Sequence, residues 1–246
     1  MTRLRLFQIR LAATGGLLLP LVAVVRLLWF PDAYFAIFEV GKLLLILAGV
    51  ALIIGPVLSV VVFKPGKKGL KLDLVVLAVL EVAAVTVGAR QLYARQPFYA
   101  VFAVDRFEAV TRAEIDTTKI VEPAWLTRPG HAPRLVYAEL PRDPVVLDRL
   151  INETVFEGKR DIDRRPEFWR PYAAGISRLK AAARPLGLLL SEDSERGERA
   201  RRWLARKGGG ARDYIFVPLR GRNHDAAMIL HADIGFPVGT LTVDPW

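Results

Sequence analysis

An uncharged run from Leu43 to Phe63 leads directly into a short loop with four lysines, Lys64 to Lys71 (KPGKKGLK). This junction constrains the fold more than any other stretch of the chain. The run has 21 residues, and a bilayer core of about 30 Å needs about 20 helical residues to cross it. Lysines in short loops stay on the cytoplasmic side of a membrane. The junction therefore predicts a membrane-spanning helix and its direction.

Two further apolar stretches flank this run. Residues 11–30 contain a single charge, Arg26, near the far end, where a long side chain can reach the interface. Residues 74–89 contain Glu81 as their only charge. They are followed by Arg90 and by Tyr93, a residue type that anchors helices at interfaces. We therefore expect three spans, at about 11–30, 43–63 and 74–93.

Basic residues also predict the orientation of these spans. A basic N-terminus (Arg3, Arg5, Arg10) and the lysine loop lie at opposite ends of the first two spans, and both favour the cytoplasm. Three crossings then leave residues 96–246 outside the cytoplasm. The expected fold is a membrane protein with a membrane domain at 1–95, built of three transmembrane α-helices, followed by one α+β extracytoplasmic domain at 96–246.

The net charge of +10 fits this topology. Residues 1–95 hold 11 of the 35 Lys and Arg but only four of the 25 acids, so +7 of the charge flanks the apolar spans. A basic chain can instead indicate nucleic-acid binding. The concentration of charge beside the spans favours a topology signal, so we expect no nucleic-acid partner and a solvated face for the arginines of the C-terminal part.

The first span has two interpretations. Its basic start and apolar core are also found in cleaved signal peptides. However, the core runs to Phe30, contains Pro20 and is followed by no clear cleavage site, which favours an uncleaved anchor. The chain has no cysteine, but a domain of this size can bury a core without disulfides.

The extracytoplasmic part alternates between strand and helix patterns. Runs of β-branched and aromatic residues bounded by turn residues predict strands, apolar residues at helical spacing predict helices, and the SEDSE segment before residue 196 predicts an N-cap. We expect strands at 98–104, 135–140, 214–219, 226–232 and 238–243, the last two joined by a hairpin, and helices at 145–156, at 175–190 with a break at Pro185, and from the SEDSE segment to Arg206.

No motif in the chain points to catalysis. There are only three histidines (His131, His224, His231), without the spacing of a zinc site, and no nucleophile or phosphate-loop motif. The acids Asp105, Asp161, Asp163 and Asp233 are scattered, as turn and cap residues are. We therefore expect no enzymatic activity, no metal and no cofactor.

Glu81 is the exceptional residue within the spans. A carboxylate at that depth costs about 3 kcal/mol unless it is protonated or paired, and we expect no basic partner for it within the chain. One alternative is a neutral acid that is hydrogen-bonded to a helix carbonyl, Thr14 or Thr86. The other is contact with a membrane helix of another protein, which the small residues Ala84 and Gly88 would allow to approach closely.

A cluster of aromatic residues bracketed by prolines, PEFWRPY, covers residues 166–172. Two interpretations are open for Trp169 and Tyr172. The cluster can be an ordered loop that closes the core, or it can anchor a partner, because aromatic side chains dominate binding hot spots.

Several segments, taken in order, resemble the type IV pilin accessory proteins of the TfpX/TfpZ family. They are IGPVL at 54–58, VVFKPGKK at 61–68, Asp73-Leu74, VDRF at 104–107, PEFWRPY at 166–172, VPLRGR at 217–222, PVG at 237–239 and the final Asp244-Pro245-Trp246. The matches span residues 49–246. The first span resembles the family only in hydropathy, and members of the family usually carry glutamine where this chain has Glu81.

This resemblance implies a bacterial inner-membrane protein with a periplasmic domain that helps a type IV pilin to accumulate, assemble or reach the surface. Expected partners are the pilin, membrane lipid and other pilus assembly components. An alternative is a membrane-anchored envelope enzyme or ligand sensor. The candidate partner-binding residues are Gly55, Pro56, Glu81, Ala84 and Gly88 in the membrane and Trp169, Tyr172 and Trp246 outside it.

Overall fold

The computed structural model describes residues 2–246, and the chain divides into two compact units. The helical unit comprises the residues up to Trp29 together with Glu39–Arg95. The sheet unit comprises Gln96–Trp246 together with Phe30–Phe38, a segment that lies between the first two spans in the sequence.

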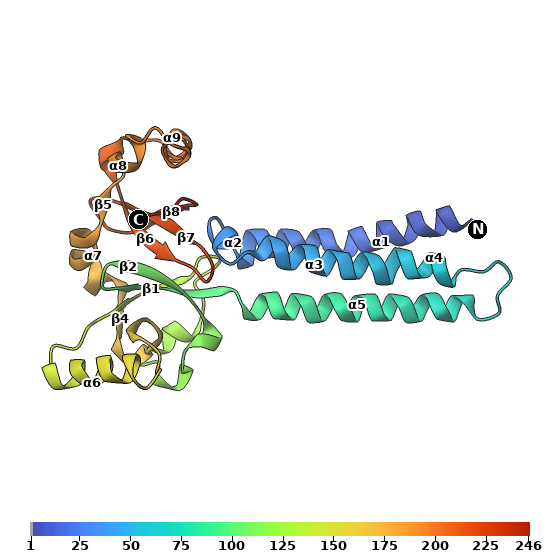
Figure 1. Ribbon diagram of the computed structural model, residues 1–246, viewed down its shortest axis with the longest axis horizontal. Coiled ribbons are helices and arrows are strands. Elements are labelled where there is room, and N and C mark those ends of the chain that lie inside the picture. The colour runs from blue at the N-terminus through green and yellow to red at the C-terminus, as the bar shows by residue number, and fades with distance from the viewer. Residues whose placement is uncertain (1) are drawn as a thin grey trace. The chain divides into compact units, whose positions relative to one another are not determined.

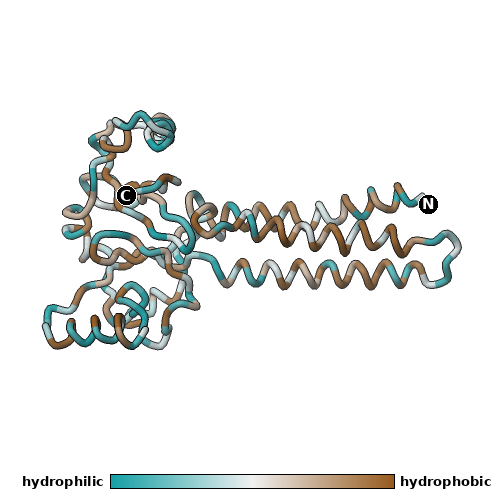
Figure 2. Tube along the Cα trace, in the orientation of Figure 1, coloured by the Kyte–Doolittle hydropathy of each residue, from teal (hydrophilic) through white to brown (hydrophobic). Residues whose placement is uncertain are grey.

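Within the described residues, the helical unit contains three helices that are long and apolar enough to cross a membrane, Arg3–Trp29, Val40–Val62 and Leu70–Ala94. The prediction of three spans is thus confirmed. Figure 2 shows mostly hydrophobic residues along them, and Figure 1 shows that consecutive helices run in opposite directions. The helices begin earlier than predicted, because polar residues extend a helix beyond its apolar core. The first helix begins where the Thr2 hydroxyl accepts a hydrogen bond from the Arg5 amide.

Two of these helices contain π-helical turns. The first consists of α1 (Arg3–Val24) and the π-turn η1 (Val25–Trp29). The second consists of α3 (Val40–Leu52), the π-turn η2 (Ile53–Val57) and α4 (Leu58–Val62). Pro56 lies within η2, and a proline has no N–H and crowds the carbonyl four residues before it, so the turn widens. The third helix, α5 (Leu70–Ala94), is uninterrupted.

The sheet unit is built on one mixed sheet, which contains eight strands in the described residues (Figure 1). In spatial order the strands are β4 (Trp169–Pro171), β3 (Arg134–Ala138), β1 (Pro97–Ala103), β2 (Arg106–Thr111), β6 (Tyr214–Arg220), β7 (Asp225–His231) and β8 (Pro237–Leu241), with β5 (Arg184–Pro185) paired to β6. The β1–β3 and β2–β6 pairs are parallel and the others antiparallel. This arrangement confirms the α+β fold class.

Short helices connect these strands, and one further short helix, α2 (Tyr34–Ile37), lies in the segment Phe30–Phe38. The other α-helices are α6 (Pro144–Val155), α7 (Ile176–Ala182), α8 (Gly187–Leu190) and α9 (Glu195–Lys207). The 3-10 turns are η3 (Arg112–Glu114), η4 (Thr117–Lys119), η5 (Pro123–Leu126), η6 (Ile162–Arg164), η7 (Pro166–Phe168), η8 (Tyr172–Gly175) and η9 (Ala211–Asp213). The predicted capping of α9 is confirmed, since the Ser194 hydroxyl accepts a hydrogen bond from the Gly197 amide.

The five predicted strands and the terminal hairpin are confirmed, whereas β2, β4 and β5 were not predicted. The predicted break at Pro185 within residues 175–190 is confirmed, since α7 ends at Ala182 and α8 begins at Gly187. Between these helices, Arg184 and Pro185 form β5, which pairs with Phe216 and Ile215 of β6. Pro185 lacks the N–H that a continuous helix would need here, and the backbone between α7 and α8 pairs with β6 instead.

The core of the sheet unit includes two groups of buried side chains. One surrounds Tyr99, Val136 and Trp169. The other surrounds Leu186, Trp203 and Phe216. The helix α9 is amphipathic, with Ala200 and Trp203 packed inward, so its arginines lie on the outer side.

The segment Phe30–Phe38 completes the sheet unit. Phe30 and Ile37 are fully buried. The Ala33 amide donates to Thr240 Oγ1 of β8 at 3.0 Å, and the Asn223 amide donates to the Ile37 carbonyl at 3.3 Å. A Cβ atom at Gly221 would lie 2.6 Å from Ile37 Cβ. The loop between the first two spans is therefore part of the core of the sheet unit.

Candidate functional site

The helical unit contains a buried polar cluster that joins all three spans. Glu81 of α5 is only 4% exposed, and Thr14 of α1 and Ser59 of α4 are buried. Arg10 Nη2 of α1 lies 2.6 Å from Glu81 Oε2, and Arg10 Nε donates to Ser59 Oγ at 3.1 Å. The Thr14 hydroxyl donates to Glu81 Oε1. Four polar contacts, counting the bond from Ser59 Oγ to the carbonyl of Gly55, thus converge here.

The expectation that Glu81 has no basic partner within the chain is wrong. Hydropathy placed the start of the first span at residue 11, so Arg10 was counted with the N-terminal flank. The helix in fact begins at Arg3, and Arg10 lies two turns inside it. The predicted hydrogen bond between Thr14 and Glu81 is present, whereas the Thr86 hydroxyl donates to the Val82 carbonyl at 2.7 Å and not to Glu81.

Pairing offsets the cost of burying these charges. One unpaired charge within a span costs about 3 kcal/mol. The cluster satisfies Glu81 with a guanidinium and a hydroxyl, and it engages Arg10 through two of its nitrogens. The ion pair and its hydrogen bonds therefore fix the relative positions of α1, α4 and α5.

Gly55 and Pro56 lie beside this cluster. A Cβ atom at Gly55 would lie 2.6 Å from both Glu81 Oε1 and Thr14 Oγ1, so only glycine leaves room for these oxygens. Pro56 is buried in the π-turn η2. Both residues were predicted to bind a partner, and the structure brings Gly55 together with Glu81 inside the helical unit.

Gly88 and Ala84 lie further along α5, and both are partly buried. A Cβ atom at Gly88 would lie 2.5 Å from Leu47 Cδ1 of α3. The small residue at 88 thus allows close packing against a helix of the same chain. The role of these residues in binding a partner helix stays a prediction.

Trp169 and Tyr172 are core residues of the sheet unit. The ring centroid of Trp169 lies 4.8 Å from that of Tyr99 and 6.2 Å from that of Trp125. The Tyr172 hydroxyl donates to the Gly235 carbonyl at 2.5 Å, and burial raises the pKa of this phenol. The structure agrees with the alternative in which the aromatic cluster closes the core.

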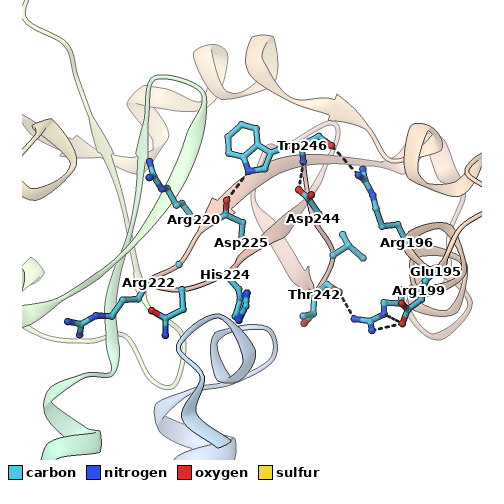
Figure 3. Close-up of a pocket in the computed structure, with 13 residues that line it drawn as sticks. Glu195, Arg196, Arg199, Arg220, Arg222, His224, Asp225, Thr242, Asp244 and Trp246 are labelled. Carbon is cyan, nitrogen blue, oxygen red and sulfur yellow. Dashed lines mark hydrogen bonds and ion pairs between the residues drawn. The ribbon is translucent and has the colours of Figure 1, made fainter. Parts of the chain in front are cut away.

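Trp246 is different, because its side chain is 48% exposed at a cleft of about 690 Å³. Figure 3 shows Arg220 and Arg222 on one side of this cleft and Arg196 and Arg199 on the other. The charge distribution along the sequence predicts only a solvated face for these arginines. They come from distant segments, and only the order of the strands and the position of α9 bring them together.

A third charged group surrounds the buried acids Glu108 and Asp163 of the sheet unit. Arg106 Nε donates to Glu108 Oε1 at 2.9 Å, and Arg164 pairs with Asp163. Burial, opposed in part by Arg164, raises the pKa of the Asp163 carboxyl to about 6. Asp163 is thus a buried titratable acid and not only a turn residue. Within residues 2–246, no group of three or more His, Asp or Glu is arranged to hold a metal ion.

Comparison with known proteins identifies two relatives, both from Dichelobacter nodosus. The chain is 25% identical over 184 residues to the fimbrial assembly protein of serogroup E1, which covers 71% of this chain and 68% of the relative. It is 25% identical over 176 residues to the fimbrial assembly protein of serogroup I, covering 68% and 65%. No model of a protein family and no solved structure matches the chain. The chain is therefore related, at low identity, to proteins of fimbrial assembly.

Proposed function

We propose that this protein is an inner-membrane accessory factor of type IV pilus biogenesis that holds a pilin in the membrane before assembly. The observation that carries the proposal is the similarity to fimbrial assembly proteins over 184 residues. The segments that resemble the TfpX/TfpZ family support the more specific role of a pilin accessory protein. Other pilus assembly components and membrane lipid are further partners.

The proposed orientation follows the distribution of lysines. The loop between α4 and α5 carries Lys64, Lys67 and Lys68, which favour the cytoplasm. With the N-terminus on the same side, the sheet unit lies in the periplasm. A pilin that awaits assembly as a membrane-anchored subunit would then meet the helical unit within the bilayer and the sheet unit outside it.

The proposed action is chaperone-like and not catalytic. The polar cluster of Arg10 and Glu81 holds the three helices in a fixed arrangement, which leaves apolar faces outward. On α5 such a face includes Val75, Val79 and Val82, each about half exposed or more. A preorganised apolar face can bind a partner helix at a low cost in conformational entropy.

The test is a pull-down of a tagged full-length copy from detergent, combined with deletion of the gene. We expect recovery of a pilin and loss of surface pili on deletion. A Val79→Trp variant adds bulk to the exposed face of α5, and Leu19→Trp makes the same change on the exposed face of α1. A difference between the two in pilin recovery would locate the contact. A copy that recovers no pilin, with unchanged pili on deletion, would refute the proposal.

One observation favours a second candidate, a ligand sensor. The sheet unit contains a largely apolar pocket of about 590 Å³ whose walls include Tyr34, Met228 and Phe236. Pockets of this size and composition bind small molecules. Ligand-dependent thermal stabilisation of a protein that recovers no pilin would support this candidate.

A further inference from the structure

The cleft beside Trp246 is assembled from three separate segments of the sheet unit. The end of β6 and the turn after it provide Arg220 and Arg222, the helix α9 provides Arg196 and Arg199, and the C-terminal segment provides Trp246 (Figure 3). Four arginines and one exposed indole therefore line a single open cleft of about 690 Å³.

The side of the cleft formed by α9 is held in place by hydrogen bonds. Arg199 donates from Nε and Nη2 to Glu195 Oε1, at 3.1 and 2.6 Å, and from Nη1 to the Thr242 carbonyl at 2.8 Å. Arg196 Nη1 donates to the Trp246 carbonyl at 3.1 Å, and its Nη2 lies 3.2 Å from Glu192 Oε1. These two guanidinium groups thus have fixed positions before any ligand binds.

Trp246 is also held in place although it is half exposed. Its Nε1 donates to Asp225 Oδ2 at 2.8 Å, and its backbone amide donates to Asp244 Oδ1 at 3.1 Å. An exposed indole that is already ordered loses little side-chain entropy on binding. Ordered tryptophan next to arginine is the composition of a binding hot spot.

The charges of the cleft are not balanced equally on its two sides. The acids Glu195, Asp225 and Asp244 each accept hydrogen bonds from groups of the cleft itself. On the opposite side, Arg220 Nη1 lies 3.9 Å from Glu108 Oε1, which already accepts a shorter bond from Arg106. Among residues 2–246, no hydrogen bond or ion pair holds Arg222. Positive charge on this side is therefore available to a ligand.

We propose that this cleft docks an acidic segment of a protein partner, with carboxylates on Arg220 and Arg222 and an apolar side chain against the Trp246 ring. Guanidinium groups bind carboxylates through paired hydrogen bonds. The three acids around the cleft disfavour a compact dianion such as phosphate, whereas a peptide can place its carboxylates away from them. If the proposed function holds, the segment belongs to a pilus component, but the chemistry of the cleft does not depend on this.

The experiment measures binding of a fluorescent peptide by the full-length protein in detergent. The probe is an eight-residue peptide of alternating Glu and Gly with one central Leu, and its Gln counterpart is the neutral control. Arg220→Glu with Arg222→Glu is expected to weaken binding of the acidic peptide at least tenfold. Trp246→Ala is expected to weaken it several-fold, and the neutral peptide is expected to bind weakly to all forms.

The matched control is Arg202→Glu with Arg206→Glu. Both residues are exposed on α9 and do not line the cleft, and the net charge changes by the same amount. This control should bind the acidic peptide within about twofold of the native protein. Equal losses in the two double variants would show a general charge effect and overturn the proposal. Arg220→Gln with Arg222→Gln provides a milder variant if the reversal of charge prevents folding.

Phosphatidylglycerol vesicles and inorganic phosphate test the other anions. If either one binds through Arg220 and Arg222 more tightly than the acidic peptide does, the ligand of the cleft is a phosphate group and not a protein segment. This result would overturn the proposal. A separate measurement distinguishes the cleft from the proposed function. If the Arg220/Arg222 variant still recovers pilin but not the acidic peptide, the cleft is a binding site and pilin is held elsewhere.

Discussion

The guanidinium of Arg10 on α1 lies 2.6 Å from the carboxylate of Glu81 on α5, across 71 residues of sequence. Either charge would be costly if it lay unpaired within a span, and the ion pair offsets this cost for both residues. The relation also explains why Gly55 is a glycine, because the two oxygens that a Cβ would meet, Glu81 Oε1 and Thr14 Oγ1, belong to the same cluster.

Replacing one member of this pair is expected to be much worse than replacing both. Arg10→Leu or Glu81→Leu alone leaves a buried charge without its partner and should lower the free energy of unfolding by about 3–5 kcal/mol. The double variant removes both charges and should lose much less. Thermal unfolding in detergent measures the difference. The control is the exposed Lys67–Asp73 pair, where Asp73→Asn should cost under about 1 kcal/mol. Additive losses in the double variant would contradict the prediction.

Gly55→Ala is expected to destabilise the helical unit. The new methyl group would lie 2.6 Å from two oxygens of the cluster, so the helices must separate, at a cost of about 1–3 kcal/mol. Gly49→Ala is the matched control, because a Cβ there would meet none of the described atoms within 4 Å. Unfolding temperatures of the two variants should differ clearly, and equal values would argue against close packing at Gly55.

Val104→Asn is expected to stabilise the sheet unit by about 1 kcal/mol. Val104 lies in the two-residue turn between β1 and β2 with a φ of 59°, a conformation that β-branched residues rarely adopt and that asparagine tolerates. Its side chain is 59% exposed, so little packing is lost. Chemical denaturation measures the change. Val121→Asn, at an exposed position without positive φ, should give no gain.

Asp163 is expected to make stability depend on pH between about 4 and 6. Its pKa is raised to about 6 in the folded protein from 3.8, so the folded state binds more protons in this interval and stability falls as pH rises through it. Asp163→Asn removes this dependence and should raise stability at pH 8 by roughly 1–3 kcal/mol. Unfolding at pH 4 and pH 8 provides the measurement, with Asp148→Asn on α6 as the exposed control. An unchanged pH dependence in Asp163→Asn would show that other groups cause it.

The sequence predicted the spans well and their ends poorly, for one physical reason. Hydropathy detects the part of a helix that lies in hydrocarbon, whereas the helix itself continues as long as its backbone hydrogen bonds do. Arg10 lies in the difference between the two definitions. The partner of Glu81 was therefore present in the sequence but was counted as a flanking residue.

The strands were predicted where apolar residues are continuous, and β2 was missed because Arg106 and Glu108 interrupt it. The turn before it also carries Val104-Asp105, without the glycine or asparagine that marks a tight hairpin. The arginine-lined cleft had no local signal at all. Its residues are separated by up to 50 positions, and they meet only because β6, β7 and β8 are neighbours and α9 packs beside them.

The burial of the segment Phe30–Phe38 in the sheet unit has a consequence for biosynthesis. Ala33 bonds to Thr240, which is made 207 residues later. At about 5–20 residues per second, the ribosome needs about 10–40 s to bridge that interval. All three spans have been synthesised by then, and the apolar side chains between the first two remain without their partners in the sheet. The segment Phe30–Phe38 is thus synthesised early but can pack fully only late, after β8 has been synthesised.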